Sequence, residues 1–316
     1  MPGKITNHLE LSRVIGNKKA LYRTMEAYFA FTEGASYLPL TFHITGGLED
    51  DEYLRFLRDY YRMSKEGLNC WIVKPGELSN RGRHIKFCKT LPDIKKEIKE
   101  RKTNANGSLR TYIVQSYIDR PLLYHGRKFD LRHYLMVTST EGTIRGYFYQ
   151  EGYVRTTSQN YSINSPQPGV HLTNDAVQKY LPNYGKFEKG NKLSYRQLNE
   201  YMLKINPKKG FYDVVFPQIR TISKEVIEAA FPFIDPQRRS SNFEIFGIDV
   251  MIDSNYKCWL IEVNTNPCIE VSCKVLADVV PHMLDNAFTI ALDSVVAPPS
   301  SKLKSSHENA VEWNKF

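Results

Sequence analysis

Two apolar segments late in the sequence, each carrying acidic residues, constrain the fold more than any other feature. The first spans Phe243–Ile252 and the second spans Lys257–Val263, with the polar residues DSNY between them. Both segments are rich in β-branched and aromatic residues, as strands are, and the polar residues are typical of a turn. We therefore predict that the two segments form a β-hairpin.

Three oxygen-bearing side chains fall on one face of this predicted hairpin. Side chains alternate between the faces of a strand, so a register that places Asp249 opposite Leu260 or Glu262 brings two carboxylates together. Asn264 follows on the same face. Two buried acids this close destabilise each other's charge unless a cation neutralises them, and hard oxygen ligands suit Mg²⁺. The sequence therefore predicts a magnesium site; in the alternative, Asp249 caps a turn and Glu262 pairs with a basic side chain.

A lysine ends the strand predicted for WIVKP, at a position that a core would ordinarily fill with an apolar residue. Lys74 there is a suitable point charge for a phosphate group. In the polar loop that follows, Gly82 would let the backbone approach phosphate oxygens, with Arg81 and Arg83 beside it. The segment IKFC then resumes an extended structure, which predicts a second hairpin. An ordinary turn without a ligand is the alternative.

Acidic and basic residues alternate in the segment GRKFDLRHY. Lys128, Asp130 and Arg132 therefore share one face of an extended segment. Asp130 could hold a ribose while the two basic side chains face phosphates or a carboxylate, and a surface charge ladder is the alternative. Arg155 is a further candidate for binding a carboxylate or an acyl phosphate. For His171 we expect a hydrogen-bonded structural role.

The positive charge of the chain is concentrated in one stretch. Between Trp71 and Arg155 there are 17 Lys or Arg against 8 Asp or Glu, whereas the rest of the chain has 26 of each, so this stretch carries the whole net charge of +9. Such a concentration attracts polyanions such as nucleotide phosphates, nucleic acid or acidic protein tails.

Several common functional classes lack their sequence signals. The chain has no GxxxxGK[ST], GxGxxG, HExxH or GxSxG motif. Its five cysteines form no CxxC pair and are odd in number, which favours reduced thiols over disulfides or a zinc site. We see no secretory signal and no apolar run approaching the roughly 20 residues that span a bilayer, so we expect no membrane partner.

Strand and helix patterns are mixed along the chain, which indicates an α+β architecture. Further strands are predicted at Thr111–Ile118, Leu131–Thr138 and Ile144–Gln150. Helices are predicted at Glu49–Lys65, Tyr195–Ile205, Gln218–Phe231 and Cys273–Ala291. The last 16 residues are polar and predict a loose tail.

Taken together, these segments resemble the tubulin tyrosine ligase family of ATP-grasp ligases. The resemblance spans Trp71 to Glu270 and rests on WIVKP with NRG, YIVQSYIDRPLL, GRKFDLRHY, EGYVRTTSQNYS, HLTNDAVQK, NYGKFEKGN, FEIFGIDVMID and WLIEVNTNPCIE. It implies an ATP-grasp fold, with two α+β lobes clasping ATP. We expect a short N-terminal lobe at 1–36, a central lobe at 37–118, a C-terminal lobe with the metal site at 119–298, and a polar tail at 299–316.

The resemblance also implies roles for individual residues. The catalytic residues would be Arg132, Arg155 and Glu262. The ATP-binding residues would be Lys74, Arg81, Gly82, Gln115, Tyr117, Ile118, Lys128 and Asp130. The Mg²⁺ ligands would be Asp249, Glu262 and Asn264.

The activity implied is the joining of an amino acid to an acidic tubulin C-terminal tail through an acyl phosphate, with tyrosine or glutamate as the free amino acid substrate. A glycine ligase, a ligase acting on another acidic protein, and a catalytically silent microtubule-binding module are the alternatives. The family resemblance further implies a cytoplasmic, cytoskeleton-associated location, with the cilium or basal body as a more specific site. We expect a monomer that binds no nucleic acid.

Overall fold

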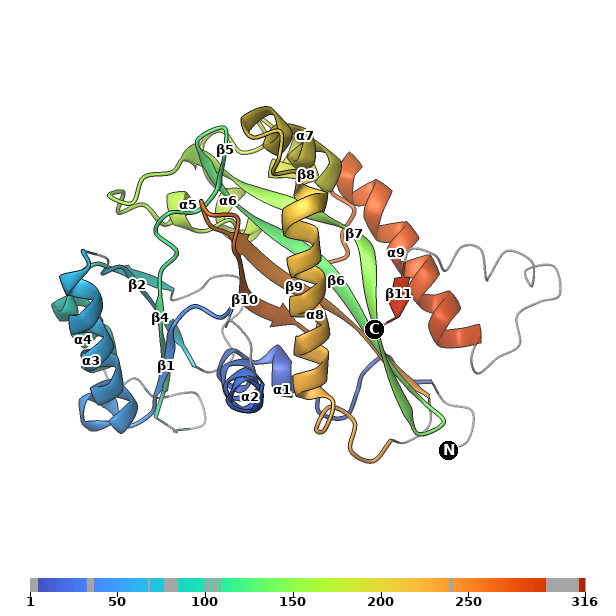
Figure 1. The fold of residues 1–316 in the computed structure, drawn as a ribbon, viewed down its shortest axis with the longest axis horizontal. Coiled ribbons are helices and arrows are strands. Elements are labelled where there is room, and N and C mark those ends of the chain that lie inside the picture. The colour runs from blue at the N-terminus through green and yellow to red at the C-terminus, as the bar shows by residue number, and fades with distance from the viewer. Residues whose placement is uncertain are drawn as a thin grey trace.

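The computed structural model describes residues 5–32, 37–67, 69–76, 85–99, 103, 107, 109–238, 241–293 and 313–315. Two antiparallel sheets organise this part of the chain, and helices pack against both (Figure 1). The predicted α+β class is confirmed. Each of the five cysteines is a free thiol, as expected.

The smaller sheet has four strands in the order β1-β4-β2-β3. Its strands are β1 (Thr41–Ile44), β2 (Trp71–Pro75), β3 (Lys86–Cys88) and β4 (Tyr112–Ser116). The predicted hairpin of WIVKP with IKFC is present as β2 and β3. Helices α3 (Asp51–Lys65) and α4 (Leu91–Lys99) supply the apolar side chains that cover this sheet. Aromatic packing fixes α3 on the sheet, because the Phe56 ring meets the Trp71 ring edge-on at 4.9 Å.

The larger sheet has seven strands, and its main path is β10-β9-β6-β7-β11. Its strands are β5 (Leu123–Tyr124), β6 (Arg127–Thr140), β7 (Thr143–Asn160), β8 (Lys192–Ser194), β9 (Asn242–Ile252), β10 (Cys258–Asn264) and β11 (Trp313–Lys315). β6 and β7 form a long hairpin around Glu141 and Gly142, which both have positive φ angles of 50° and 73°. A two-residue turn with this backbone matches the twist of the strands it joins.

Opposite faces of the larger sheet pack against different helices. Leu131, Leu135 and Val137 of β6 face the core shared with α2 (Lys18–Phe31), α7 (Tyr195–Ile205) and α8 (Phe216–Ala230). Tyr134 and Met136 point the other way, into the core beneath α9 (Lys274–Asp293). The alternation along β6 therefore separates two apolar cores, and α8 is seen crossing in front of the sheet in Figure 1.

Two expectations for the C-terminal part are wrong. The segment Lys274–Leu292 is long and apolar enough to cross a membrane by length and composition. In this structure its side chains Leu276, Val280 and Met283 are buried against the larger sheet. The tail is also not loose throughout, because Trp313–Lys315 pairs with Tyr147–Tyr149 of β7 as the strand β11.

The N-terminal segment packs mainly on the larger sheet. α1 (Arg13–Gly16) and α2 contact β10 and α8. The remaining short elements are η1 (Gly47–Glu49), α5 (Pro168–His171), α6 (Asp175–Gln178), η2 (Lys189–Asn191) and η3 (Phe211–Val215). The predicted division of the chain into lobes remains a prediction, although the two sheets correspond to its central and C-terminal parts.

Candidate functional site

A β-bulge brings the two predicted metal-binding acids opposite each other. Val250 of β9 pairs with Leu260 of β10, but the next pair is Asp249 with Glu262, so Ile261 is the extra residue. A regular ladder would have placed Ile261 opposite Asp249. Because bulges redirect side chains in this way, the register predicted from the sequence, with Asp249 opposite Glu262, is confirmed.

Charged side chains continue from this pair across the sheet onto β6 and β7. Arg132 lies beside Asp249 in the ladder between β6 and β9, and its Nε donates to Oδ1 of Asp249 at 2.6 Å. Arg155 lies opposite Asp130 in the ladder between β6 and β7, and its Nε donates to Oδ1 of Asp130 at 2.8 Å. Nη2 of Arg155 also donates to Oδ2 of Asp249 at 2.7 Å.

Two arginines thus hold Asp249 in its charged form. Burial on its own would raise the pKa of Asp249, but the guanidinium groups of Arg132 and Arg155 outweigh burial and hold this pKa well below its ordinary value. The sequence argument assumed that the buried acids would need a cation for neutralisation. For Asp249 the protein itself supplies the positive charge, and for Arg132 and Arg155 it supplies carboxylate partners.

Glu262 has a different environment. Burial and the neighbouring charge of Asp249 raise the pKa of Glu262 above its ordinary value. Its closest cation among the printed ion pairs is Lys18 of α2, whose Nζ lies 3.8 Å from Oε2 of Glu262. Glu262 therefore does pair with a basic side chain, as the structural alternative expected, whereas Asp249 lies within β9 and caps no turn.

These side chains fit a divalent cation in their chemistry. Asp249 and Glu262 offer carboxylate oxygens on neighbouring strands, and Asn264 offers an amide oxygen while its Nδ2 donates to the carbonyl of Gly247 at 3.2 Å. Within the described residues, no group of three or more His, Cys, Asp or Glu side chains could hold a metal ion. A cation here would therefore need the amide of Asn264 as a ligand, and this all-oxygen set is of the type that Mg²⁺ prefers.

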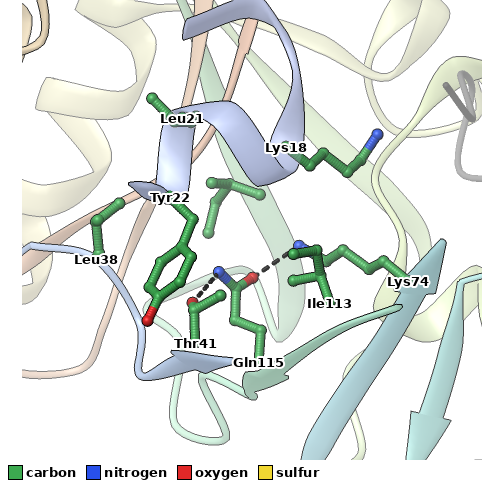
Figure 2. Close-up of a pocket in the computed structure, with 9 residues that line it drawn as sticks. Lys18, Leu21, Tyr22, Leu38, Thr41, Lys74, Ile113 and Gln115 are labelled. Carbon is green, nitrogen blue, oxygen red and sulfur yellow. Dashed lines mark hydrogen bonds between the residues drawn. The ribbon is translucent and has the colours of Figure 1, made fainter. Parts of the chain in front are cut away.

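Lys74 is buried at the end of β2 and is fixed by the smaller sheet. Its Nζ donates to Oε1 of Gln115 at 2.7 Å, and Nε2 of Gln115 donates to the hydroxyl of Thr41 at 2.9 Å (Figure 2). Burial lowers the pKa of Lys74 to about 8. The lysine is therefore held in place on neutral hydrogen-bonding partners.

Lys128 is a second buried lysine, carried by the larger sheet. Its Nζ donates to the hydroxyl of Tyr117 at 2.8 Å and lies 4.3 Å from the centre of the Tyr117 ring. Burial lowers the pKa of Lys128 to about 7, and the charge of Lys74 adds to this effect. The Tyr117 hydroxyl also meets Nδ1 of His171 at 2.9 Å, and Nε2 of His171 meets the carbonyl of Ser165 at 2.8 Å. The hydrogen-bonded role expected for His171 agrees with these contacts.

A small cavity lies next to Lys74. It has a volume of about 20 Å³, room for roughly one water molecule. Its lining comes from α2, β1, β2, β4 and β10 and is formed by Lys18, Leu21, Tyr22, Leu38, Thr41, Lys74, Ile113, Gln115 and Ile261 (Figure 2). The cavity is too small for a nucleotide, so it marks where the two sheets and α2 meet and not the extent of a ligand site.

Some predicted residues lie elsewhere or were missed. Arg81 and Gly82 fall outside the described residues, and Ile118 is partly buried just after β4. Lys18 was not predicted, because no local motif distinguishes it from the adjacent Lys19. The tertiary contact of Lys18 with Glu262 is what identifies it.

Comparison with known proteins adds to this geometry. A sequence profile of the "Tubulin-tyrosine ligase family" matches residues 2–304. The chain is 34% identical over 234 residues to tubulin glycylase 3A of Drosophila melanogaster, covering 73% of this chain and 23% of that protein. It is 31% identical over 316 residues to the probable alpha-tubulin polyglutamylase Ttll1 of Tetrahymena thermophila, covering 94% of this chain and 73% of that protein. It is also 32% identical over 238 residues to the human inactive polyglycylase TTLL10, covering 71% of this chain and 35% of that protein.

Proposed function

Because this chain belongs to the tubulin-tyrosine ligase family, we propose that it uses ATP to join an amino acid to a carboxylate of a tubulin tail. The chain spans less than a quarter of the length of tubulin glycylase 3A, so the activity, substrates and partners of this protein are part of the proposal. The family is consistent with the α+β fold of two sheets and with an ATP-grasp architecture.

The observation that carries the proposal is the pair of buried lysines on different sheets. Lys74 ends β2 of the smaller sheet and Lys128 begins β6 of the larger sheet, and each has a lowered pKa because of its burial. Two buried cations that lower each other's affinity for protons favour a polyanionic ligand between them. The phosphates of ATP meet this requirement.

The acidic residues of the larger sheet would hold the Mg²⁺ that ATP-grasp ligases use. Asp249, Glu262 and Asn264 would be its protein ligands, and the ion would neutralise charge that develops on the transferring phosphoryl group. The raised pKa of Glu262 supports this assignment, because a nearby cation would relieve the repulsion from Asp249 that contributes to it.

The chain's own residues would act by binding and orientation. Lys74 and Lys128 would hold the phosphates, while Arg132 and Arg155 would bind the carboxylate that is activated or the carboxylate of the free amino acid. An oxygen of the acceptor carboxylate takes the γ-phosphoryl group and ADP leaves, giving an acyl phosphate. The amine of the free amino acid then attacks the acyl carbon, phosphate departs and the amine loses a proton. This sequence needs no nucleophilic side chain, so catalysis depends on positioning and electrostatic stabilisation.

The excess of basic residues between Trp71 and Arg155 supports an acidic acceptor, and tubulin C-terminal tails are strongly acidic. The names of the relatives favour glycine or glutamate over tyrosine as the amino acid, because they include a glycylase and a polyglutamylase. An association with the cytoskeleton follows from a tubulin substrate. A catalytically silent module is the second candidate, because TTLL10 is named an inactive polyglycylase.

The test is an incorporation assay with the purified chain, Mg²⁺, ATP and microtubules, in which labelled glycine, glutamate and tyrosine are supplied separately. We expect one amino acid to enter tubulin, with no incorporation when ATP is omitted or when the acidic tails have been removed. Microtubule binding without incorporation of any of the three would favour the silent module. Incorporation into tail-less tubulin would contradict the proposed acceptor.

A further inference from the structure

The N-terminal helices reach the edge of the candidate site at a defined corner. α1 ends at Gly16, and Asn17 caps the 14-residue helix α2, since its Oδ1 accepts from the backbone N–H of Lys19 at 3.1 Å and of Ala20 at 3.4 Å. An N-cap of this kind fixes where the helix begins. Lys18 is therefore the first residue of α2, with its backbone set by the cap.

This corner packs against the end of the strand that carries the predicted metal ligands. A Cβ atom on Gly16 would overlap Cγ2 of Thr265, which follows Asn264 at the end of β10. The absence of a side chain at Gly16 lets the corner approach this closely. The position of Lys18 relative to Glu262 thus depends on a close backbone contact and is not that of a freely placed surface lysine.

The side chain of Lys18 lies among groups already assigned to the nucleotide and the metal. Its Nζ is 3.8 Å from Oε2 of Glu262, and the two side chains are 19% and 24% exposed. Lys18 lines the same cavity as Lys74 and Gln115, which Figure 2 shows beneath α2. Two positive side chains therefore border one small space, beside a single carboxylate.

We propose that Lys18 is a third nucleotide-binding lysine, which contacts phosphate oxygens of bound ATP together with Lys74. This inference rests on the proposed function. A purely structural role is the competing explanation, in which Lys18 and Glu262 simply fasten α2 to β10. The Asn17 cap and the contact between Gly16 and Thr265 already fasten this corner, however, and a partly exposed ion pair adds little.

The placement of Lys18 also has an electrostatic cost that a fastening role does not explain. The charge of Lys18 lowers the pKa of Lys74, so the two ammonium groups disfavour each other when no anion is bound. A bound phosphate would reverse the sign of this interaction, because both lysines would then share an anion. The arrangement is thus favourable in a nucleotide complex and unfavourable without one.

The experiment compares wild type with Lys18→Met, Lys18→Arg and the control Lys19→Met, which changes the neighbouring lysine of the same helix turn. Isothermal titration calorimetry would measure the Kd of a non-hydrolysable ATP analogue with Mg²⁺ and, separately, the Kd of adenosine. Thermal melting without nucleotide would report on folding. We expect Lys18→Met to weaken binding of the ATP analogue about tenfold and to leave adenosine binding unchanged, since a single charged contact to phosphate is lost. Lys18→Arg should retain most of the affinity, and Lys19→Met should behave as wild type.

The outcomes separate this inference from the proposed function. Wild type that binds no ATP analogue would refute the proposed function and the inference with it. Wild type that binds the analogue with an affinity that Lys18→Met does not change would overturn the inference alone. An equal loss of ATP-analogue and adenosine binding, or a lowered melting temperature without nucleotide, would show a structural role. If Lys18→Met does not fold, the same comparison with Lys18→Gln decides.

Discussion

Glu262 lies opposite Asp249 because Ile261 is the extra residue of a β-bulge in β10. The bulge places a carboxylate with a raised pKa next to one whose pKa two arginines hold low. Two acids on adjacent strands therefore differ in charge preference, although both come from strands with similar apolar sequences. Glu262 is accordingly the acid that a bound cation would affect more.

The first prediction concerns this residue. Glu262→Gln should abolish amino acid incorporation, by a factor of at least about 100, because the amide cannot supply the negative charge for the cation. The variant should remain folded, since the side chain keeps its shape and loses its repulsion from Asp249. Incorporation assays and thermal melting would check both parts, with Glu200→Gln on the exposed face of α7 as the control. Undiminished turnover in Glu262→Gln would refute the metal assignment.

The second prediction concerns the pH dependence of stability in the absence of nucleotide. The pKa of Lys128 falls from its ordinary value of 10.5 to about 7 in the folded protein. Between these two values the unfolded chain holds a proton that the folded chain lacks, so stability should rise with pH by up to about 1.4 kcal/mol per unit. In Lys128→Met this contribution is absent. The variant should therefore be relatively more stable near pH 7, with its advantage shrinking towards pH 10.

Urea unfolding at pH 7, 8 and 9 would measure this effect. The exposed residue Lys208 offers a matched control, because Lys208→Met should leave the pH dependence of wild type unchanged. Free energies of unfolding for wild type and Lys128→Met that run parallel across this range would contradict the assigned burial of the Lys128 charge.

The third prediction concerns a buried ion pair away from the predicted metal ligands. Nη1 of Arg127 donates to Oε2 of Glu188 at 2.7 Å, and the hydroxyl of Thr156 donates to the same oxygen at 3.0 Å. The side chains of Arg127 and Glu188 are only 3% and 12% exposed. Glu188→Gln should lower the free energy of unfolding by about 3–5 kcal/mol, because it leaves the Arg127 charge buried without its partner.

A surface pair provides the comparison for this measurement. Arg196 and Glu200 are 82% and 61% exposed, so Glu200→Gln should change the free energy of unfolding by less than about 0.5 kcal/mol. Urea midpoints with an unchanged m value would give both numbers. Equal and small losses in the two variants would show that the buried pair contributes no more than the exposed one.

The fourth prediction tests the close packing behind Arg132. A Cβ atom on Gly152 would overlap the hydroxyl of Tyr195 and would lie 2.5 Å from the carbonyl oxygen of Arg132. Gly152→Ala should therefore destabilise the protein by about 1–3 kcal/mol and displace the strand that carries Arg132. Incorporation should fall with it, since small displacements of binding groups reduce rates.

A second glycine offers the control for this variant. A Cβ atom on Gly46 would have no neighbour closer than 3.5 Å, and its φ angle of −94° is allowed for alanine. Gly46→Ala should leave stability and incorporation close to wild type. The packing argument fails if Gly152→Ala melts and reacts as wild type does.

Local sequence patterns predicted much of this fold. The hairpin of β9 and β10 followed from apolar residues around a polar turn, and the register choice was narrowed to two possibilities. The bulge that decides between them depends on which residue the folded strand pair leaves out, and the sequence does not show this. β7 was predicted as Ile144–Gln150 but extends to Asn160, because pairing with β6 and β8 overrides the weak strand propensity of its polar second half.

Long-range contacts account for what the sequence could not predict in the site. Asp130, Arg132, Arg155 and Asp249 were recognised individually, but their mutual pairing depends on the order of three strands. Lys18 was missed because it lies about 240 residues before Glu262, and nothing in its own neighbourhood marks the contact. The tail residues Trp313–Lys315 are likewise a strand only because the edge of β7 is there to receive them.

The pairing of Arg155 with both Asp130 and Asp249 means that the protein occupies its own carboxylate-binding groups. An incoming carboxylate can engage Arg155 only by exchange with one of these internal acids, so its net affinity is the difference between two similar interactions. Such a self-occupied site discriminates against simple anions, which gain little from the exchange. It also lets a spent substrate depart easily, because the resident aspartates return to the guanidinium group as it leaves.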